Sequence, residues 1–457
     1  MWTATTCRGD TMAEVKATPT IVHGAAPVEP LPITPERYLS PTYMQREADN
    51  LWPRMWLFAC LERDVANVGD FSVFNLGRES IIISRTQEGN IAAFYNACQH
   101  RGAKVATEDR GCVAKFVCPY HGWSYRLDGK LVVVPDNNRF CGGVDRNERS
   151  MQQVQVDTFA GLVWICMDNN AAPLREYLGM VGDRIAPFHM ENMTLVGDQT
   201  VRLDCNWKAV YDNFGELYHV EHIHPQHAML FDCPTAQVEL FENGHTGVNI
   251  IGHTVNSRLP IPEEPNFYQK VQLEKYGVDP ALYNGRNLDI RLDIQKIRRQ
   301  KGPELGFDYS ELSDERLSDI EQYNLFPNMM ITAQPESALV MRARPHPTDP
   351  NKCFWDKYTF KLVPNPEVAA RAGVEFRPSN PKDLLPIPRP THDEFEQDDV
   401  IAGRKTMDIT VDQDVHLIRD IQAGMHSRGF TSQILSEEEA RIQHYHDWLD
   451  YFMGERS

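Results

Sequence analysis

Short runs of β-branched and aromatic residues dominate the chain from about residue 57 to residue 170. The runs FSVFNL, SIIISR, IAAFYNA, KFVCPY, KLVVVP and GLVWICM are separated by Gly, Asp and Asn turn residues. The dipeptide Asp128-Gly129 between two of these runs is typical of a hairpin turn. Short strands separated by turn residues at regular intervals predict an all-β module. A charged segment over residues 36–56, before this module, is predicted to be helical.

Beyond Pro187 the pattern becomes mixed. The run LVGDQTVRLDC predicts a strand that enters a helical segment, NWKAVYDNFGELYHVEHIH. Charged stretches over 255–325, such as RLDIQKIRRQ and SDERLSDIEQYN, predict further helices. The runs MMITAQ, ALVMRARP and CFWDKYTFKLVP then predict three antiparallel strands, and the C-terminal part returns to helix.

These blocks predict an α+β fold with two domains, because strands and helices fall in separate stretches of the sequence. We expect a flexible N-terminal arm over residues 1–40, which are rich in Pro, Ala and Thr. An N-terminal all-β domain follows over 41–175, including its leading helix. A larger C-terminal domain over 176–457 should hold an antiparallel sheet flanked by helices.

Charge and composition restrict the classes of partner. The chain carries 46 Lys and Arg against 64 Asp and Glu, a formal charge of −18, and has no basic stripe, which argues against binding to nucleic acid or an anionic membrane. It has no apolar run long enough to span a membrane and no secretory signal at its N-terminus, so a cytoplasmic location is expected. Its 10 Cys are scattered, which favours free thiols over a disulfide framework.

Two short Cys/His pairs are the first candidate for chemistry. Cys98 and His100 lie in the run CQHRG, and Cys118 and His121 lie in CPYHGW. A Rieske [2Fe–2S] centre needs two Cys on one iron and two His on the other. A tetrahedral zinc site could use the same four residues, but zinc sites usually pair Cys with Cys and His with His. The mixed pairs within β-structure favour the iron–sulfur centre, and Cys112, which has no nearby His, is interpreted as packing.

A second group of ligand types lies in NFGELYHVEHIHP. On a helix, Glu216 and His219 share a face, because they are three residues apart. His224 comes five residues after His219, about 140° around the helix, and would converge with it only if the helix ended, which the following proline favours. Two His and a carboxylate form the facial triad of non-haem iron oxygenases. Other histidines, including His222, crowd this run, so from spacing alone an exposed His-rich turn remains an equal alternative.

The third ligand of such a triad must come from elsewhere in the chain. In VDQDVHLIRDIQAGM, Val411, Ile418, Ile421 and Met425 form an apolar stripe at helical spacing, and Asp414 lies on it. A carboxylate on a buried face is costly unless it is paired or bound to a metal. The alternative is that Asp414 caps or pairs within the first turn of this helix. We favour ligation, because two His ligands need a carboxylate.

The Cys/His segments also resemble those of a known family. CQHRGAKV and CPYHGWSY resemble the Rieske signature of the large, catalytic subunits of ring-hydroxylating oxygenases. The resemblance implies that Cys98 and Cys118 bind one iron and His100 and His121 the other. It also implies that two aromatic side chains of the second segment pack over the cluster, Tyr120 and Trp123.

The segment NWKAVYDNFGELYHVEHIH resembles the catalytic motif of the same family. The resemblance selects His219, His224 and Asp414 as ligands of a mononuclear Fe(II). It gives Glu216 the role of relaying electrons between subunits, and it places Asn213 in the catalytic motif. A Glu at this spacing looks more like the oxygenases that act on quaternary amines and other non-ring groups than like ring dioxygenases.

The family implies a multicomponent enzyme, an NAD(P)H-dependent mono- or dioxygenase. Electrons relayed from the [2Fe–2S] cluster would let the mononuclear iron use O₂ to hydroxylate, dihydroxylate or demethylate an organic substrate, aromatic or otherwise hydrophobic. Residues 225–260 and 325–345 are expected to line its pocket. The chain has no G-x-G-x-x-G fingerprint, so NAD(P)H would act through a separate reductase, with or without a ferredoxin. A ring-shaped homotrimer, with or without a small beta subunit, is implied.

Two other classes of protein could carry the same motifs. A non-catalytic Rieske electron carrier would hold only the cluster, with two irons per chain instead of three. A zinc-stabilised binding protein would be colourless. The large C-terminal region, with its candidate triad, argues against the carrier.

Overall fold

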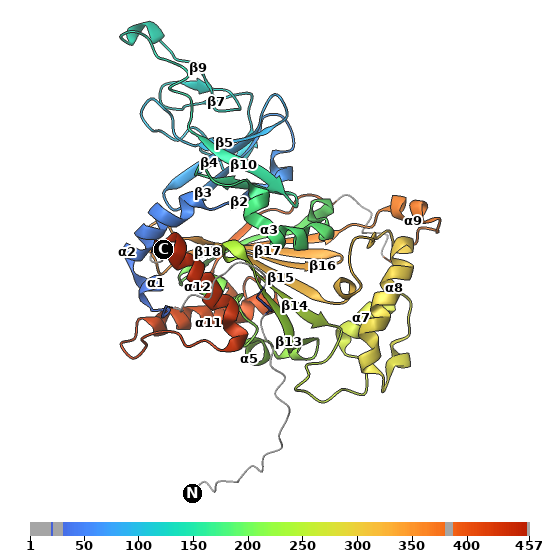
Figure 1. Ribbon diagram of the computed structural model, residues 1–457. Coiled ribbons are helices and arrows are strands. Elements are labelled where there is room, and N and C mark those ends of the chain that lie inside the picture. The colour runs from blue at the N-terminus through green and yellow to red at the C-terminus, as the bar shows by residue number, and fades with distance from the viewer. Residues whose placement is uncertain (1–19, 22–30, 380–386, 455–457) are drawn as a thin grey trace.

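The chain folds into an N-terminal β lobe and a larger domain of mixed sheet and helix, seen in the computed structural model of Figure 1. The structure describes residues 20–21, 31–379 and 387–454, so most of the predicted arm over 1–40 lies outside the described residues. The predicted α+β class is confirmed, with the β module first and the antiparallel sheet with its helices after it.

The N-terminal lobe contains two sheets. The larger one has the strand order β2-β11-β10-β5-β4-β3-β6, and the smaller one has the order β7-β8-β9. Gly129, at a φ of +79°, closes the hairpin between β8 and β9, as the Asp-Gly dipeptide predicts. The strands are β2 Leu57–Leu61, β3 Asp70–Leu76, β4 Glu79–Arg85, β5 Ile91–Tyr95, β6 Arg110–Cys112, β7 Phe116–Val117, β8 Ser124–Tyr125, β9 Leu131–Val133, β10 Gln153–Phe159 and β11 Leu162–Cys166.

A nine-stranded sheet with the order β1-β13-β14-β15-β16-β17-β18-β12-β19 forms the larger domain. The run from β13 through β18 to β12 is antiparallel throughout, and the parallel partners β1 and β19 lie at its two edges. The strands are β1 Thr20–Ile21, β12 Met193–Leu203, β13 Phe231–Leu240, β14 Thr246–Gly252, β15 Ile320–Leu325, β16 Met329–Gln334, β17 Ser337–Pro345, β18 Cys353–Leu362 and β19 Asp393–Glu396.

Helices surround this sheet (Figure 1). Apolar side chains of the leading helices, of both lobes and of the C-terminal helices join in one continuous core, so the two lobes are packed together. The helices are α1 Glu36–Leu39, α2 Pro41–Arg46, α3 Leu174–Ile185, α4 Trp207–Asn213, α5 Val220–Ile223, α6 Pro225–Ala228, α7 Phe267–Lys275, α8 Ile290–Leu305, α9 Pro366–Ala372, α10 Gln397–Ile401, α11 Ile409–Met425 and α12 Ala440–Phe452. No helix of these described parts is long and apolar enough to cross a membrane.

The structure corrects two predicted helices. The stretch SDERLSDIEQYN forms a short 3₁₀ turn, Glu315–Leu317, and then strand β15, because Tyr323 and Leu325 are buried inside the sheet. The segment from Asn206 onward is not one helix, because α4 ends at Asn213 and helix resumes only at Val220. This interruption shapes the candidate site described below.

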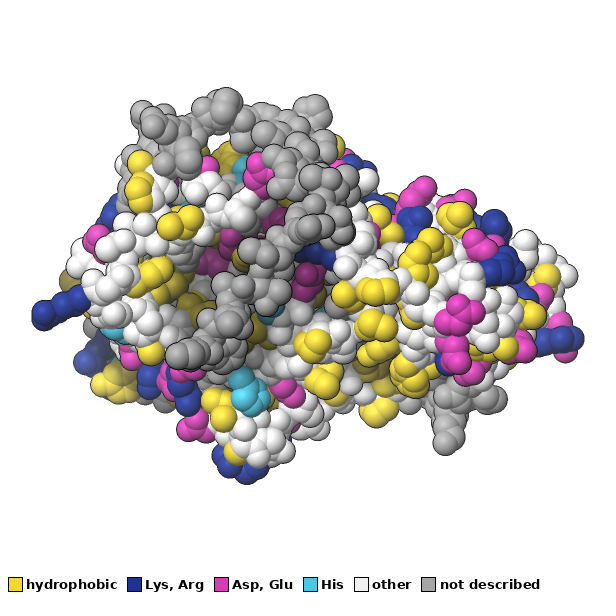
Figure 2. Space-filling view, turned by 90° about the horizontal axis from the view of Figure 1, so that it is seen from below, with side chains coloured by type: hydrophobic (Ala, Val, Ile, Leu, Met, Phe, Trp, Pro, Cys, Tyr) yellow, Lys and Arg dark blue, Asp and Glu magenta, His cyan; other side chains and the backbone are white. Residues whose placement is uncertain are grey.

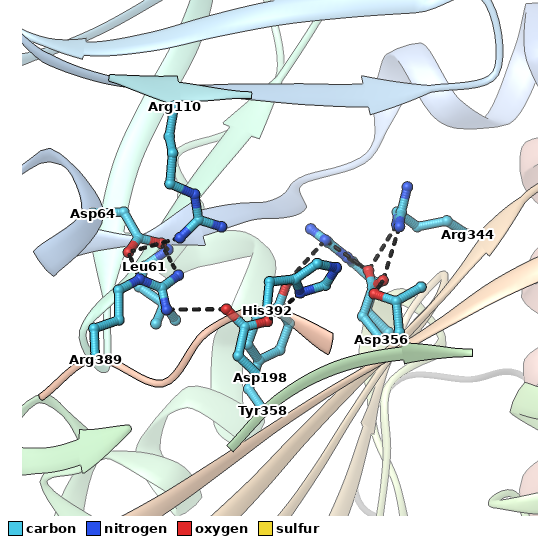
Figure 3. Close-up of polar contacts among 11 residues, drawn as sticks. Leu61, Asp64, Arg110, Asp198, Arg344, Asp356, Tyr358, Arg389 and His392 are labelled. Carbon is cyan, nitrogen blue, oxygen red and sulfur yellow. Dashed lines mark hydrogen bonds and ion pairs between the residues drawn. The ribbon is translucent and has the colours of Figure 1, made fainter. Parts of the chain in front are cut away.

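Ion pairs and hydrogen bonds join the two lobes beside β12 and β18 (Figure 3). Arg389 forms ion pairs with Asp64 of the N-terminal lobe at 2.9 Å and with Asp198 of β12 at 3.0 Å. Arg342 of β17 donates to the Phe58 carbonyl of β2 at 2.6 Å and to Asp356 of β18 at 2.8 Å. Charged groups therefore hold the lobes in one orientation.

Asp356 at this junction yields a prediction for stability. The side chain is buried and accepts hydrogen bonds from Arg342, Arg344 and Thr200. Burial alone would raise its pKa, but the two guanidinium groups outweigh burial and hold the pKa well below the usual range. Asp356→Asn should lower the free energy of unfolding at pH 7 by about 3 kcal/mol, because it leaves two buried cations underpaired. Urea unfolding measures this loss.

The same depressed pKa fixes the pH dependence. The stabilisation by Asp356 is present above its unfolded-state pKa, about pH 4, and is lost as the pH falls through the folded-state value. Part of the wild-type loss of stability in acid should therefore be absent from Asp356→Asn. The matched control is Asp308→Asn, which breaks an exposed ion pair with Arg371 and should change stability by less than about 1 kcal/mol. Equal effects of the two substitutions would contradict the prediction.

Candidate metal centres

Two loops of similar backbone carry the Cys/His pairs of the N-terminal lobe. The amide of Gly102 donates to the Cys98 carbonyl at 2.8 Å, and that of Gly122 donates to the Cys118 carbonyl at 3.0 Å. Both glycines have left-handed φ values, +78° and +73°, which other residues rarely adopt. Each loop thus turns its Cys inward and brings its His to the outer side. Asn96 fixes the first loop through hydrogen bonds to the backbone of residues 105–106.

The thiols and the imidazoles of these loops lie on different sides. Cys98 and Cys118 are each 2% exposed, and the rings of His100 and His121 lie 4.6 Å apart on the outer side. Trp123 stacks on His100 at 4.9 Å. A second stacking contact joins the ring of His121 to that of Tyr120 at 3.8 Å. Both aromatic side chains therefore pack on the imidazoles of the two loops.

The electrostatics of the four side chains suit metal ligands. Burial and then the neighbouring Cys118 raise the pKa of the Cys98 thiol, so its thiolate needs a cation to stabilise it. Burial and then His121 and Arg101 lower the pKa of His100, which keeps its ring neutral. The Nδ1 atom of His100 is buried without a hydrogen-bond partner and is thus available to a metal.

Two Cys and two His on paired loops fit a cluster, in which the thiolates and the imidazoles bind different iron atoms. Cys112 is exposed on strand β6, so its interpretation as packing is wrong.

The second site lies where the helix after β12 is interrupted. Gly215 follows α4, and a Cβ there would approach Ile442 to 2.9 Å and the Asp212 carbonyl to 3.0 Å, so the chain can turn here only with glycine. His219 lies in this turn and His224 lies after the last residue of α5. Because α5 ends at Ile223 and His224 leaves the helical conformation, the 140° separation expected on a continuous helix does not apply, and both rings face Asp414 of α11.

Asp414 of α11 completes a buried triad of ligand types. Its Oδ1 lies 3.0 Å from His224 Nε2 and 3.8 Å from His219 Nε2. This oxygen is buried and has no well-aligned hydrogen bond among the described residues, so the three donor atoms converge as they would around a cation. Asp408 caps α11 by accepting from the amides of residues 410 and 411, so the interpretation of Asp414 as the cap is wrong.

Neighbouring side chains orient the two imidazoles. The Glu216 carboxylate contacts His219 Nδ1 and accepts from the His219 amide at 3.0 Å. Gln413 Oε1 lies 2.7 Å from His224 Nδ1. Both rings therefore turn Nε2 toward Asp414, an arrangement common around metal-binding His. The sequence analysis missed Gln413, whose only signal is its position beside Asp414.

A cavity of about 260 Å³ opens onto the triad. Asn213 lies in its wall, with a buried Nδ2 that has no hydrogen-bond partner among the described residues. Burial and then His224 lower the pKa of His227 to about 4, so this wall residue is neutral at pH 7. The remaining wall is mostly apolar and is formed by Phe214, Leu217, Val220, Phe231, Cys233, Ile250, Ile320, Leu339 and Val411.

The wall confirms only part of the predicted pocket. Phe231 and Ile250 line the cavity and come from the predicted range 225–260. Phe214, Leu217 and Ile320 lie outside both predicted ranges and were missed. Ile421 of the predicted apolar stripe is exposed on α11, and Gln422 is buried instead, so that part of the stripe was wrong.

The fold and the two donor sets define a two-domain protein with a Rieske lobe and a catalytic domain, and comparison with known proteins agrees. Residues 55–159 match the model of the Rieske [2Fe-2S] domain, and residues 190–455 match that of the ring hydroxylating alpha subunit (catalytic domain). The second match covers more than half of the chain. The chain therefore belongs to the ring-hydroxylating alpha subunits, a family that uses a Rieske cluster, a mononuclear iron and O₂.

Curated relatives include subunits of several oxygenases. The chain is 30% identical over 189 residues to the glycine betaine monooxygenase oxygenase subunit of Pseudomonas aeruginosa, which is 41% of this chain and 44% of that protein. It is 34% identical over 186 residues to the naphthalene 1,2-dioxygenase large oxygenase component of Pseudomonas aeruginosa, 39% of this chain and 41% of that protein. The matched region thus spans less than half of either relative.

Solved structures share the fold over nearly the whole chain. A quaternary ammonium Rieske monooxygenase in complex with L-carnitine has a TM-score of 0.62 at 18% identity, covering 92% of this chain and 95% of that one. A naphthalene 1,2-dioxygenase variant bound to phenanthrene has a TM-score of 0.63 at 17% identity, covering 93% of each chain. At these identities the likeness shows the fold alone.

Proposed function

We propose that this chain is the oxygenase component of a multicomponent Rieske system, which hydroxylates, dihydroxylates or oxidatively demethylates an organic substrate. One observation carries the proposal: a buried His, His and Asp set converges at the end of a mostly apolar cavity, in a chain whose other lobe carries the Cys/His loops. A non-catalytic electron carrier needs no mononuclear metal site. A zinc-stabilised binding protein needs neither that site nor an iron–sulfur cluster.

Each proposed ligand has a distinct part. Cys98 and Cys118 hold one iron of the cluster, and His100 and His121 hold the other. His219, His224 and Asp414 hold the mononuclear iron, which supplies O₂ chemistry when bound.

Residues beside the triad would bind, orient and exclude water. Glu216 holds His219 in its orientation, and we assign it the relay of electrons from a neighbouring subunit. Asn213 has a free amide donor in the cavity wall and is proposed as a catalytic residue that contacts substrate or O₂. The apolar wall excludes water from the remaining volume and favours a hydrophobic substrate.

The separation of the two sites supports the proposal of a ring-shaped homotrimer. Strands β7 and β9 lie at the top of Figure 1 and α5 lies at the bottom, so one chain's cluster is remote from its own triad. Exposed apolar side chains, including Ile409 and Leu417 of α11, are available for a subunit contact, and Figure 2 shows hydrophobic side chains gathered on the underside. A head-to-tail contact can close into a ring. Sedimentation as a monomer at assay concentration would contradict the homotrimer.

We also propose the electron-transfer partners, the domain boundaries and the cellular location of this protein. Electrons would come from NAD(P)H through a separate reductase, with or without a ferredoxin, and a small beta subunit is an optional partner. The domain limits are 41–175 for the Rieske domain and 176–457 for the catalytic domain, supported by the division of strands between sheets. The free thiols of the described cysteines support a cytoplasmic location.

The metal content of the purified wild-type chain tests this function. Anaerobic purification should yield a red-brown protein with about three irons and two acid-labile sulfides per chain, and dithionite should produce a rhombic EPR signal of low average g. Addition of a reductase, NADH and a hydrophobic substrate should then consume O₂. A colourless protein that contains zinc would exclude the proposal. Two irons that do not rise to three after reconstitution with Fe(II) would favour the electron carrier.

A further inference from the structure

A second cavity, of about 330 Å³, adjoins the triad cavity. Four side chains line both spaces: His227, Phe231, Ile320 and Gln334. The two cavities therefore lie back to back, separated only by this shared wall. We call the second cavity the polar chamber, because the side chains that line it alone are mainly polar: His253, Asn266, Tyr268, Gln269, Gln272, Arg298, Ser318 and Asp319.

Arg298 of α8 is the charged group of the polar chamber. It is only 7% exposed, and its ion pair with Glu336 is a long one. Its Nη1 donates to the Leu317 carbonyl and its Nη2 donates to Gln272 at 3.1 Å. Its Nε makes no hydrogen bond among the described residues, and the nearest carboxylate, that of Glu336, is 3.9 Å away. A buried donor of this kind is costly to leave unmatched.

The acidic groups around the chamber are already occupied by other partners. Glu336 forms an ion pair with Lys275 and accepts hydrogen bonds from Tyr309 at 2.5 Å and Tyr276 at 3.1 Å. Asp319 accepts two hydrogen bonds from Arg291, at 2.8 and 2.9 Å. Glu336 faces two cations, Lys275 and Arg298, so one positive charge of this group is left in excess.

The neutral side chains of the chamber do not offset this charge. Burial, and then Arg298 and Arg291, lower the pKa of His253 to about 3, so its ring is neutral at pH 7. Gln272 uses its Oε1 to accept from Arg298, and its Nε2 makes no hydrogen bond among the described residues. The chamber therefore offers a buried cation and an amide donor but no free anion.

We infer that the polar chamber binds the carboxylate of an elongated substrate whose apolar part lies in the triad cavity. The inference rests on the proposed function and adds the chemical class of the substrate: an amphiphilic organic acid. Arg298 is the specificity-determining group, because its charge distinguishes a carboxylate from an amide, and the Nε2 of Gln272 adds a second donor to either. The ligand would cross from one cavity to the other along the four side chains that line both.

Matched ligands test this inference on the purified holoprotein. The probes are ω-phenylalkanoates with chains of about two to eight carbons, each paired with its primary amide, and calorimetry gives their Kd values. At one or more chain lengths the carboxylate should bind about tenfold more tightly than its amide, the effect of one charge-assisted hydrogen bond. Affinity should rise with length until the phenyl ring reaches the triad cavity. Equal binding of acids and amides at every length, or affinity independent of length, would overturn the inference.

Variants of two chamber residues locate the effect. Arg298→Gln should abolish the preference for the acid, and Arg298→Lys should retain part of it. Arg298 also donates to the Leu317 carbonyl, so a second variant should keep the arginine. In Gln272→Glu the new carboxylate should pair with Arg298 and remove the preference for the acid. Gln272→Leu should keep most of that preference. The matched control is Arg286→Gln, an exposed arginine that pairs with Asp289 and does not line the chamber. A preference that survives both Arg298→Gln and Gln272→Glu would contradict the assignment.

The outcomes separate this inference from the proposed function. Binding is measured without turnover, so it does not depend on a reductase. A protein with three irons and no preference for acids would overturn the inference and leave the oxygenase intact. A protein that prefers acids but contains neither cluster nor mononuclear iron would overturn the proposed function and leave the chamber's ligand class standing.

Discussion

Substitution of His219 by alanine is expected to remove the mononuclear iron and all turnover above background, while the cluster remains. Loss of an outer partner of a metal ligand already costs about 10–100-fold in affinity, so loss of one of three protein ligands should cost more. Asp414 and His224 would then hold the ion alone, 3.0 Å apart in the free protein. Iron should fall from about three to about two per chain, with sulfide and the reduced EPR signal unchanged.

Two comparisons make the effect of His219→Ala specific. His222→Ala removes an exposed imidazole from the same segment and should leave three irons and full turnover. Asp414→Asn keeps the size of the side chain but removes the charge at the centre of the site, and it should reproduce the loss of iron. Turnover that persists in His219→Ala with three irons per chain would assign the mononuclear site to other residues.

The ligand motifs were predictable because their chemistry is local. Each Cys/His pair lies within one short loop, and the Gly after each pair marks the turn that orients it. The convergence of His219 and His224 was left open from spacing alone, because it depends on where a helix stops. Pro225 signalled that interruption at one end. At the other end Gly215 is needed because of Ile442, a contact more than two hundred residues away that no local pattern contains.

Other parts of the site depend on contacts distant in sequence, which periodicity cannot predict. The stretch SDERLSDIEQYN has the charge pattern of a helix, but its second half is a central strand, paired with β14 and β16. Ile421 falls on the predicted apolar stripe of α11 but is exposed, because Gln422 and Met425 turn to the core instead. Arg298 looks like an ordinary charge on a surface helix, and only the packing of α7, α8 and β15 buries it.

Substitution of Cys118 by serine is expected to remove the whole [2Fe–2S] cluster, with both of its irons and both sulfides. The Cys118 side chain is buried with Cys98 between two loops. No other thiolate therefore has room to take the place of the ligand that Cys118→Ser removes. Visible colour and the EPR signal should disappear, and turnover should stop because electrons no longer reach the mononuclear iron. Iron and sulfide analysis after anaerobic purification measures the change.

Cys112→Ser is the control, because Cys112 lies between the two pairs in sequence but is exposed on β6 and should not affect the cluster. Cys118→Ser and His219→Ala are expected to be complementary: the first retains about one iron and no sulfide, and the second retains about two irons and full sulfide. Mixing the two variant proteins tests the proposed relay across subunits. If subunits exchange, an intact cluster of one chain can serve the intact triad of its neighbour, and part of the turnover should return. Exchange without any recovery would show that electrons pass only within one chain.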